Sequence, residues 1–297
     1  MTPEGPTGDP TMAAVSALRA GQDVVGVFAC TRKDRLMTRN GSPYLALELR
    51  DRTGTLPARA FQNADTLAGR FDRGDVVRVR GRVERFREEL VLEVIEIARA
   101  ETVDPGHFLP TAYRDLDELD GFLEHLSGEV YDAGYQRLLS AMLADPELRA
   151  QWRRAPCTRG SHHSYLGGLL EHTVAVATLA HETCQLHPGV NSDLLICAAL
   201  VHDIGRTREF TYGAEIGVTD EGRLLGHMAI GARMLTERAD GVLDEPRLLA
   251  LLHCVLAHHG PSSVPGGRFQ SVEALTLFRL NALDAGVKGA LEHGLGA

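Results

Sequence analysis

Two kinds of hydrophobic pattern divide this chain of 297 residues. Between residues 20 and 100, apolar residues alternate with polar ones, as in Tyr44–Leu49, which is typical of strands with one buried face. Beyond residue 112, apolar residues instead recur at offsets of three, four and seven, which is typical of amphipathic helices. The patterns therefore predict two domains, an N-terminal all-β domain and a C-terminal all-α helical bundle.

The alternating half separates into five segments. The predicted strands cover residues 24–28, 44–49, 55–61, 76–83 and 90–97, and a short helix at 64–70 follows the third strand. Five strands with a helix in this position is the order of a five-stranded OB barrel. The turn Asp51–Gly54, which leads into the third strand, resembles those of nucleic-acid-binding OB domains.

Barrels of this kind bind single strands with aromatic platforms and a positively charged groove. The candidate nucleic-acid contacts in the predicted barrel are Tyr44, Phe61, Arg78, Arg80, Arg82 and Phe86. The alternative is that the rings belong to the barrel core and that the arginines form an ordinary solvated strand face.

Charge is distributed unevenly between the two halves. Residues 20–100 contain 15 Arg and Lys against 12 Asp and Glu, a balance of +3, while the whole chain carries −9, so the remainder carries −12. A mildly basic domain joined to an acidic one favours a polyanion-binding module attached to a metal-binding module.

Five histidines and two aspartates lie in the helical half at positions that otherwise carry apolar side chains. They are His172, His202, Asp203, His227, His258, His259 and Asp284. An unpaired charge buried at such a position costs several kcal/mol, so these side chains require partners. A single buried histidine is usually a core residue with satisfied hydrogen bonds. The whole set, spread over five helical segments, instead predicts a centre for divalent metal ions.

The spacing of these residues supports a family resemblance. The His202-Asp203 pair, with His172 upstream and Asp284 downstream, resembles the HD-domain phosphohydrolases, which are all-helical metal enzymes that cleave phosphate esters. Four segments resemble the YhaM-like 3′–5′ exoribonucleases more closely: His162–Thr173, His202–Gly205, Thr219–His227 and His258–Gly260. That family also carries an N-terminal OB domain.

The resemblance implies a ligand set for two divalent ions. His172, His202, Asp203 and Asp284 would hold the first ion. His227 and His258 would hold the second, with Asp203 as the bridge, and His253 is the rival for the place of His258. The expected metal is Mn²⁺, with Mg²⁺, Fe²⁺, Co²⁺ and Zn²⁺ as alternatives. His163, Arg206 and His259 would lie beside the ligands or against the substrate phosphate.

The expected function is metal-dependent 3′–5′ hydrolysis of single-stranded RNA, and of single-stranded DNA if the enzyme accepts it, with the OB domain capturing the strand. Three alternatives stay open: another HD phosphohydrolase such as a nucleotidase or cyclic-nucleotide phosphodiesterase, a non-catalytic nucleic-acid-binding protein, and a di-iron oxygenase. Three positions depart from the family pattern, which has lysine at Arg206, an acidic residue at Pro261 and aspartate at Asn281. These departures leave the ligands unchanged and bear on substrate preference.

Composition sets the expected compartment and boundaries. The five cysteines are dispersed without a CxxC pair, no apolar run approaches the length of about 20 residues that a membrane span needs, and no secretory signal begins the chain. We therefore expect a cytoplasmic protein without a membrane partner, and leave homo-oligomerisation open. The predicted boundaries are a disordered or weakly ordered segment at 1–19, an OB domain at 20–100, a linker at 101–112 and an HD domain at 113–297.

Overall fold

The computed structural model describes residues 14–100 and 104–295. The chain separates into two compact units, Met1–Leu109 with Tyr212–Ile216, and Pro110–Thr211 with Gly217–Ala297. Most of the predicted N-terminal segment and residues 101–103 of the predicted linker lie outside the described residues. Residues 14–19 include the 3₁₀ helix Val15–Ala17, and Leu18 is buried in the core of the first unit.

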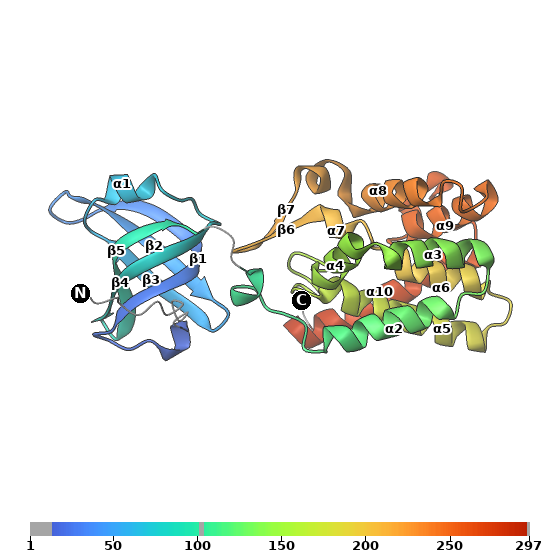
Figure 1. Ribbon diagram of the computed structural model, residues 1–297, viewed down its shortest axis with the longest axis horizontal. Coiled ribbons are helices and arrows are strands. Elements are labelled where there is room, and N and C mark those ends of the chain that lie inside the picture. Colours follow the sequence, from blue (N-terminus) through green and yellow to red (C-terminus); the bar gives the residue numbers. More distant parts are fainter. Residues whose placement is uncertain (1–13, 101–103, 296–297) are drawn as a thin grey trace, which may run out of the picture. The chain divides into compact units, whose positions relative to one another are not determined.

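The first unit is a closed barrel of five strands (Figure 1). Its elements are β1 (Asp23–Met37), β2 (Pro43–Asp51), β3 (Gly54–Ala60), α1 (Ala64–Ala68), β4 (Val76–Phe86) and β5 (Glu89–Arg99), followed by the 3₁₀ helix Pro105–His107. The strand order around the barrel is β1-β2-β3-β5-β4, with β3 and β5 parallel and the other pairs antiparallel. This arrangement confirms the predicted barrel.

Alternation along the strands builds the barrel core. In β4, Val77, Val79 and Val83 are buried, whereas the arginines between them are exposed. Because successive side chains on a strand point to opposite faces, this one strand supplies both the core and a row of surface cations. Four of the strands are longer than predicted, because their ends continue the ladders beyond the last buried residue, as β1 does from Thr31 to Met37.

The second unit is predominantly helical. Its helices are α2 (Leu116–Gly128), α3 (Ala133–Ala144), α4 (Pro146–Arg154), α5 (Gly168–Leu186), α6 (Ser192–Val201), α7 (Arg206–Glu209), α8 (Asp220–Ala239), α9 (Glu245–Ala257) and α10 (Val272–His293), with short 3₁₀ helices at Pro261–Ser263 and Pro265–Gly267. Every residue from Leu194 to Val201 is buried, so α6 is an interior helix, as its uniformly apolar sequence predicts. The predicted fold class is thereby confirmed.

One expectation for the helical half is wrong. The half was predicted to be helical throughout, but Phe210–Tyr212 (β6) and Ile216–Val218 (β7) form a two-stranded sheet. Aromatic and β-branched residues favour strands, and Gly213 lies in the short turn between them. The segment is too short to show a period, which is why the pattern did not reveal it.

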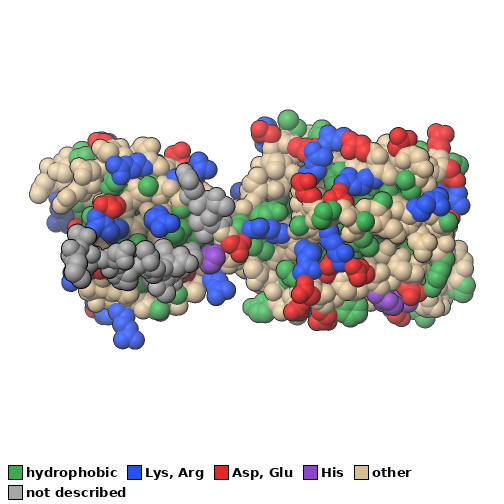
Figure 2. Space-filling model, viewed as in Figure 1, with side chains coloured by type: hydrophobic (Ala, Val, Ile, Leu, Met, Phe, Trp, Pro, Cys, Tyr) green, Lys and Arg blue, Asp and Glu red, His purple; other side chains and the backbone are tan. Residues whose placement is uncertain are grey.

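Charged side chains are mixed on the helical unit. Figure 2 shows basic and acidic side chains interspersed on the visible face of this unit, so its acidic excess does not form a single-sign patch on that face. None of the helices within residues 14–100 and 104–295 combines the length and the apolar character needed to cross a membrane.

Candidate metal centre

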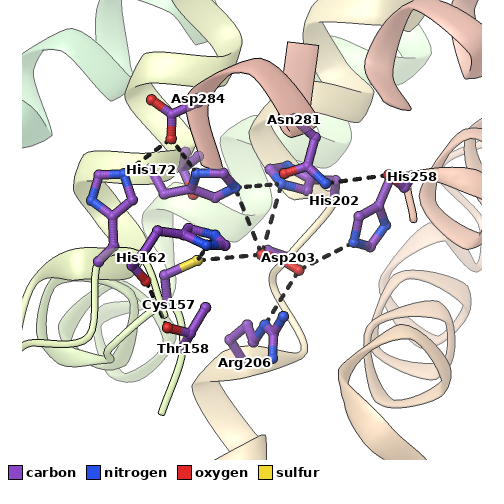
Figure 3. Close-up of polar contacts among 12 residues, drawn as sticks. Cys157, Thr158, His162, His172, His202, Asp203, Arg206, His258, Asn281 and Asp284 are labelled. Atoms are coloured by element: carbon purple, nitrogen blue, oxygen red, sulfur yellow. Dashed lines mark hydrogen bonds and ion pairs between the residues drawn. The ribbon is translucent and has the colours of Figure 1, made fainter. Parts of the chain in front are cut away.

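Five helices bring their polar residues to one buried place. His172 lies on α5, His202 and Asp203 follow α6, and His227 lies on α8. His258 and His259 follow α9, and Asp284 lies on α10. His172, His202 and His258 are fully buried, and Asp203 is 3% exposed. Figure 3 shows Asp203 in the middle of the group.

The two carboxylate oxygens of Asp203 face different pairs of histidines. Its Oδ2 lies 3.9 Å from His172 Nε2 and 3.8 Å from His202 Nε2. Its Oδ1 lies 3.2 Å from His227 Nε2 and 3.4 Å from His258 Nε2. One carboxylate therefore separates two groups of imidazole nitrogens, which is the arrangement expected of a residue that bridges two ions.

Helix ends fix two of these rings. His202 and His258 each follow the last turn of a helix, where backbone carbonyls lack helical partners. His202 Nδ1 donates a hydrogen bond to the Ala199 carbonyl at 2.8 Å, and His258 Nδ1 donates to the Val255 carbonyl at 2.5 Å. Because the proton is on Nδ1 in each ring, each Nε2 carries the lone pair that can bind a cation.

Carboxylates orient the other two rings. His172 Nδ1 lies 2.6 Å from Asp284 Oδ2, and His227 Nδ1 lies 3.5 Å from Glu209 Oε1. Glu209 also accepts the backbone N–H of His227 at 3.2 Å. That N–H is available because Gly226 has φ 69°, which interrupts α8 immediately before His227. A carboxylate behind a ligating imidazole fixes the ring and increases its basicity.

Close backbone packing brings these helices within reach of one another. A Cβ atom on Gly205 would lie 2.0 Å from the His227 carbonyl oxygen, and one on Gly168 would lie 2.2 Å from the His163 carbonyl oxygen. Gly205 has φ −61°, an ordinary right-handed value, so its lack of a side chain and not a left-handed backbone is what this position uses. Its role is to let the segment after Asp203 touch α8.

The protonation states suit metal ligands. Burial alone would raise the pKa of Asp203, but the neighbouring Arg206 guanidinium holds it well below the usual range. Burial lowers the pKa of His202 well below its ordinary value, and partial desolvation of the ring of His259, whose side chain is otherwise exposed, lowers its pKa to about 3. At neutral pH the centre thus presents an ionised carboxylate and, at these two histidines, neutral imidazoles, which are the forms that bind metals.

Two potential ligand atoms at the centre have no hydrogen-bond partner. Asp203 Oδ1 and His258 Nε2 are among the few buried side-chain atoms without a hydrogen bond in the described part of the chain. Such atoms are uncommon because an unsatisfied buried polar group is costly. The ligand separations of 3.2–3.9 Å are close to the roughly 3.3 Å between two atoms that each lie about 2.0 Å from a tetrahedral ion. The residues present therefore fit divalent cations.

Asp284, predicted to share an ion with His172, His202 and Asp203, lies beside the ring of His172. Its Oδ2 is 2.6 Å from His172 Nδ1, while the Nε2 of that ring faces His202 at 3.2 Å. One group of side chains that could hold an ion contains His172, His202 and Asp203, and another contains His163, His172 and Asp284. The hydrophobic pattern identifies the face of α10 that carries Asp284, but not which ring atom the carboxylate meets.

The other predicted residues divide into buried and accessible ones. His163 is 2% exposed, and its Nε2 lies 3.0 Å from Asp284 Oδ2. Arg206 donates to Glu209 at 2.7 Å and lies 3.5 Å from Asp203 Oδ1, so it neutralises acids in this structure. His259 is exposed, its Nε2 lies 2.9 Å from His227 Nε2, and it belongs to one group of potential metal ligands with Asp203, His227 and His258.

The structure also places His253, the alternative to His258 as a ligand, and two of the residues that depart from the family pattern. His253 Nε2 accepts the backbone N–H of Gln270, away from Asp203, whereas His258 is within the group. Asn281 donates to the His258 carbonyl at 3.2 Å, and Pro261 begins a 3₁₀ helix after Gly260.

Sequence reasoning missed three residues at the centre. Glu209, Cys157 and His162 all lie in short segments between the long helices, where no period marks a buried face. Cys157 Sγ lies 3.6 Å from Asp203 Oδ2 and 3.9 Å from His162 Nε2. For Cys157 a signal was present, since a cysteine and two histidines stand within seven positions of one another in a chain with dispersed cysteines.

On the barrel, the predicted residues form two separate sets. Tyr44 on β2 and Phe61 after β3 are stacked with ring centroids 5.3 Å apart, and Arg59 lies over the Phe86 ring at 4.4 Å. The rings of Phe61 and Phe86 are nearly half exposed, so neither belongs to the core. Arg59 is the second-last residue of β3, and Phe61 follows the strand directly.

The predicted arginines project from β4, the strand that ends at Phe86. Arg80 pairs with Glu96 at 2.5 Å, and Arg82 lies 3.6 Å from Asp23. Arg78 is exposed without an ion pair among the described residues. Two of the three therefore have acidic neighbours, as expected of a solvated strand face.

Comparison with known proteins gives matches to both halves of the chain. A profile described as HD domain matches residues 169–286, and one described as OB-fold nucleic acid binding domain matches residues 27–98. Proteins named 3′-5′ exoribonuclease YhaM from Listeria monocytogenes and Bacillus subtilis are each 28% identical over 251 residues. The match covers 83% of this chain and 80% and 79% of those proteins, respectively. Among solved structures, the second OB-fold domain of replication protein A from Methanococcus maripaludis matches 32% of this chain and 99% of its own, with 18% identity and a TM-score of 0.26.

Proposed function

Because the chain is a homologue of the YhaM 3′–5′ exoribonucleases with an HD domain and an OB-fold domain, we propose that it is a metal-dependent 3′–5′ exoribonuclease. One observation carries the proposal for its site. Asp203 faces His172 and His202 with one carboxylate oxygen, and His227 and His258 with the other.

Two divalent ions are the proposed cofactors. His172, His202 and Asp203 would hold one, with Asp284 as the further ligand implied by the family resemblance, and Asp203, His227 and His258 would hold the other. When bound, a pair of such ions lowers the pKa of water and neutralises the oxygens of a phosphodiester under attack. Imidazole and carboxylate donors suit Mn²⁺, the expected metal, and also Fe²⁺, Co²⁺ and Zn²⁺.

The surrounding residues fix the orientation and protonation of the proposed ligands. Ala199 and Val255 hold two rings in the tautomer that presents Nε2, and Glu209 holds the ring and backbone of His227. Arg206 balances the negative charge of Asp203 and Glu209. Because these contacts exist in the protein itself, the ligands need little rearrangement, which increases affinity for a cation.

His259 is the proposed contact to the substrate phosphate. It is exposed beside His227, while His163, the other histidine predicted for this role, is buried against Asp284. The low pKa of His259 keeps its imidazole neutral at physiological pH. It would thus donate a hydrogen bond to a phosphate oxygen without forming an ion pair.

The barrel is proposed to capture the strand. The stacked pair of Tyr44 and Phe61, and the ring of Phe86 with Arg59 over it, offer flat exposed surfaces beside a cation. Bases stack on such rings without regard to sequence. A single-stranded RNA is therefore the proposed partner.

Degradation of end-labelled RNA tests the proposal. The metal-stripped full chain should be inactive and should regain activity with Mn²⁺, giving products shortened only from the 3′ end. A 3′-phosphate should slow the reaction, while a circular RNA should remain intact. Cleavage of the circle would show an endonuclease, and hydrolysis of nucleotides alone would indicate a nucleotidase. Binding of RNA without any hydrolysis would indicate a non-catalytic nucleic-acid-binding protein.

A further inference from the structure

A cavity of about 580 Å³ lies on the barrel beside α1. The segment between β3 and α1 lines one side of it with Phe61 and Asn63, and β5 lines another with Glu93, Ile95 and Glu96. Sites for small molecules commonly measure roughly 300–1,000 Å³. The cavity is therefore large enough to hold part of a nucleic-acid strand, such as one nucleobase.

Irregular strand pairing shapes the β5 side of this cavity. The parallel ladder between β3 and β5 reaches only to the pair Arg59–Glu93 in the described barrel. On its β4 side, β5 has a bulge at Ile95, opposite Gly81, where a Cβ atom would lie 2.3 Å from the Glu93 carbonyl oxygen. Bulges re-aim side chains, and both Ile95 and the next residue, Glu96, are exposed. The bulge thus lets two successive side chains line the cavity.

Contacts with β1 fix the α1 side of the cavity. Lys33 Nζ donates a hydrogen bond to the Ala68 carbonyl at the end of α1 at 2.8 Å. Arg35 pairs with Asp65 in the first turn of α1 at 2.7 Å. Asn63 occupies the N-cap position with φ 53°, but its side chain does not cap the helix. An amide at this position usually accepts a helical N–H, so that of Asn63 is left available to a ligand.

The lining combines apolar surfaces with a free hydrogen-bond acceptor. Phe61 and Ile95 are each about half exposed. Glu96 pairs with Arg80 at 2.5 Å, whereas the Glu93 carboxylate has no hydrogen bond or ion pair among the described residues. Carboxylates repel a phosphate but accept hydrogen bonds from a neutral group. A flat, uncharged ligand with donors along one edge, as in a nucleobase, suits this lining.

We propose that the cavity binds a guanine base of the captured RNA, with Phe61 and Ile95 against the base and Glu93 on its Watson–Crick edge. A carboxylate only accepts, and guanine presents two adjacent donors on that edge, N1–H and N2–H. The other three bases of RNA place an acceptor next to their donor, so none pairs with both carboxylate oxygens. Arg70, which also lines the cavity, offers a cation to the adjoining phosphate.

The inference rests on the proposed capture of RNA by the barrel and adds a base preference to it. Stacking on exposed rings tolerates every base, because every base has a flat face. A bidentate hydrogen-bonded pair instead discriminates between bases. The cavity would therefore favour strands that contain guanosine.

Binding of RNA to the metal-free full chain tests the cavity, because the strand stays intact without metal. Fluorescence anisotropy compares a tract of about ten uridines with the same tract carrying one central guanosine. Guanosine should increase the affinity roughly tenfold. Adenosine at that place controls for purine stacking and should increase it less than about threefold. Inosine lacks the N2 amino group of guanosine and should lose most of the gain.

Variants assign the preference to Glu93. Glu93→Gln should remove the preference for guanosine and change the affinity for the uridine tract less than about twofold, since its charge is exposed. The matched control is Glu89→Gln, which removes an exposed carboxylate from β5 outside the cavity and should keep the preference. Guanosine monophosphate should bind at least about tenfold more weakly than the guanosine-containing RNA, because it lacks the contacts of the strand.

The outcomes separate this inference from the proposed function. Equal affinities for the uridine, adenosine and guanosine strands overturn the guanine site, whatever the activity on RNA. A preference that persists with inosine or in Glu93→Gln also overturns it. Guanosine monophosphate that binds as tightly as the strand would overturn the assignment to RNA and indicate a site for a free nucleotide. A guanosine preference in a protein that degrades no RNA after addition of Mn²⁺ would keep the site and reject the exoribonuclease.

Discussion

The imidazoles around Asp203 and the aromatic rings on the barrel are both flat side chains, but the protein holds them differently. His202 and His258 are buried, and each has its Nδ1 on a backbone carbonyl. Phe61 and Phe86 are nearly half exposed, and Phe61 stacks on Tyr44 while Arg59 lies over Phe86. A cation needs donors fixed at a short distance, whereas stacking tolerates many geometries. The difference accordingly follows the proposed chemistry of each region.

The largest expected effect is at the carboxylate between the two groups. Asp203→Asn keeps the shape but removes the charge that both ion positions share, so the rate of RNA degradation should fall about 10³-fold or more. Single-turnover rates at saturating Mn²⁺ measure the effect, with circular dichroism to verify folding. A decrease smaller than about tenfold would contradict a role for Asp203 in both ion positions.

Glu209→Gln tests whether fixing the orientation of an imidazole matters for metal binding. It removes a carboxylate that contacts the ring of His227 and leaves every proposed ligand in place. Glu209 contacts both the ring and the backbone of His227, so its loss should weaken metal binding by roughly 10–100-fold. Calorimetric titration of the metal-free protein gives the affinities. The matched control is Glu182→Gln, because Glu182 lies 3.6 Å from His181 on the surface of α5 and should leave metal binding unchanged. Equal affinities in the two variants would argue against orientation by Glu209.

Phe61→Ala tests the barrel with a smaller expected effect. The ring is partly exposed and stacks on Tyr44, so its loss should weaken RNA binding by about 1 kcal/mol, or roughly fivefold. Fluorescence anisotropy with a labelled RNA measures binding, and hydrolysis of a short model phosphodiester serves as the control. The control rate should not change. A loss of that rate with unchanged binding would assign Phe61 to folding instead of to strand capture.

The smallest effect is expected on β4. Arg80 already pairs with Glu96 on the surface, so Arg80→Ala should change RNA affinity less than about threefold. Arg59→Ala provides the comparison, because Arg59 lies over Phe86 and should matter more. A larger loss of RNA affinity in Arg80→Ala than in Arg59→Ala would place the proposed RNA path over the arginines of β4 instead of over the exposed rings.

Burial explains which parts of the site could be predicted from the sequence. His172, His202 and Asp203 occupy apolar positions in helical segments, and a polar residue there requires a partner, so the pattern identifies it. Glu209 and Cys157 lie in short connecting segments, where no apolar period distinguishes a buried position. The contact of Asp284 with Nδ1 of His172 depends on ring orientation, which residue types and spacing do not determine.

The same physical reason applies to the fold. The five strands of the barrel and the interior helix α6 were predictable because alternation and a continuous apolar run each imply one buried arrangement. The sheet of β6 and β7 was not, since each strand has only three residues. The barrel residues could be named as candidates, but the contacts among them, such as that of Arg59 on β3 with Phe86 on β4, follow from strand order, which exposed side chains do not encode.

The most direct test is the number of ions that the protein holds. Metal-free full chain, loaded with Mn²⁺ or Zn²⁺ and freed of excess, should contain about two ions per chain by elemental analysis, because Asp203 faces one pair of histidines with each oxygen. Asp203→Asn should lose most of this content. One ion per chain in the active wild-type protein would contradict the bridging role of Asp203 and with it the two-ion centre.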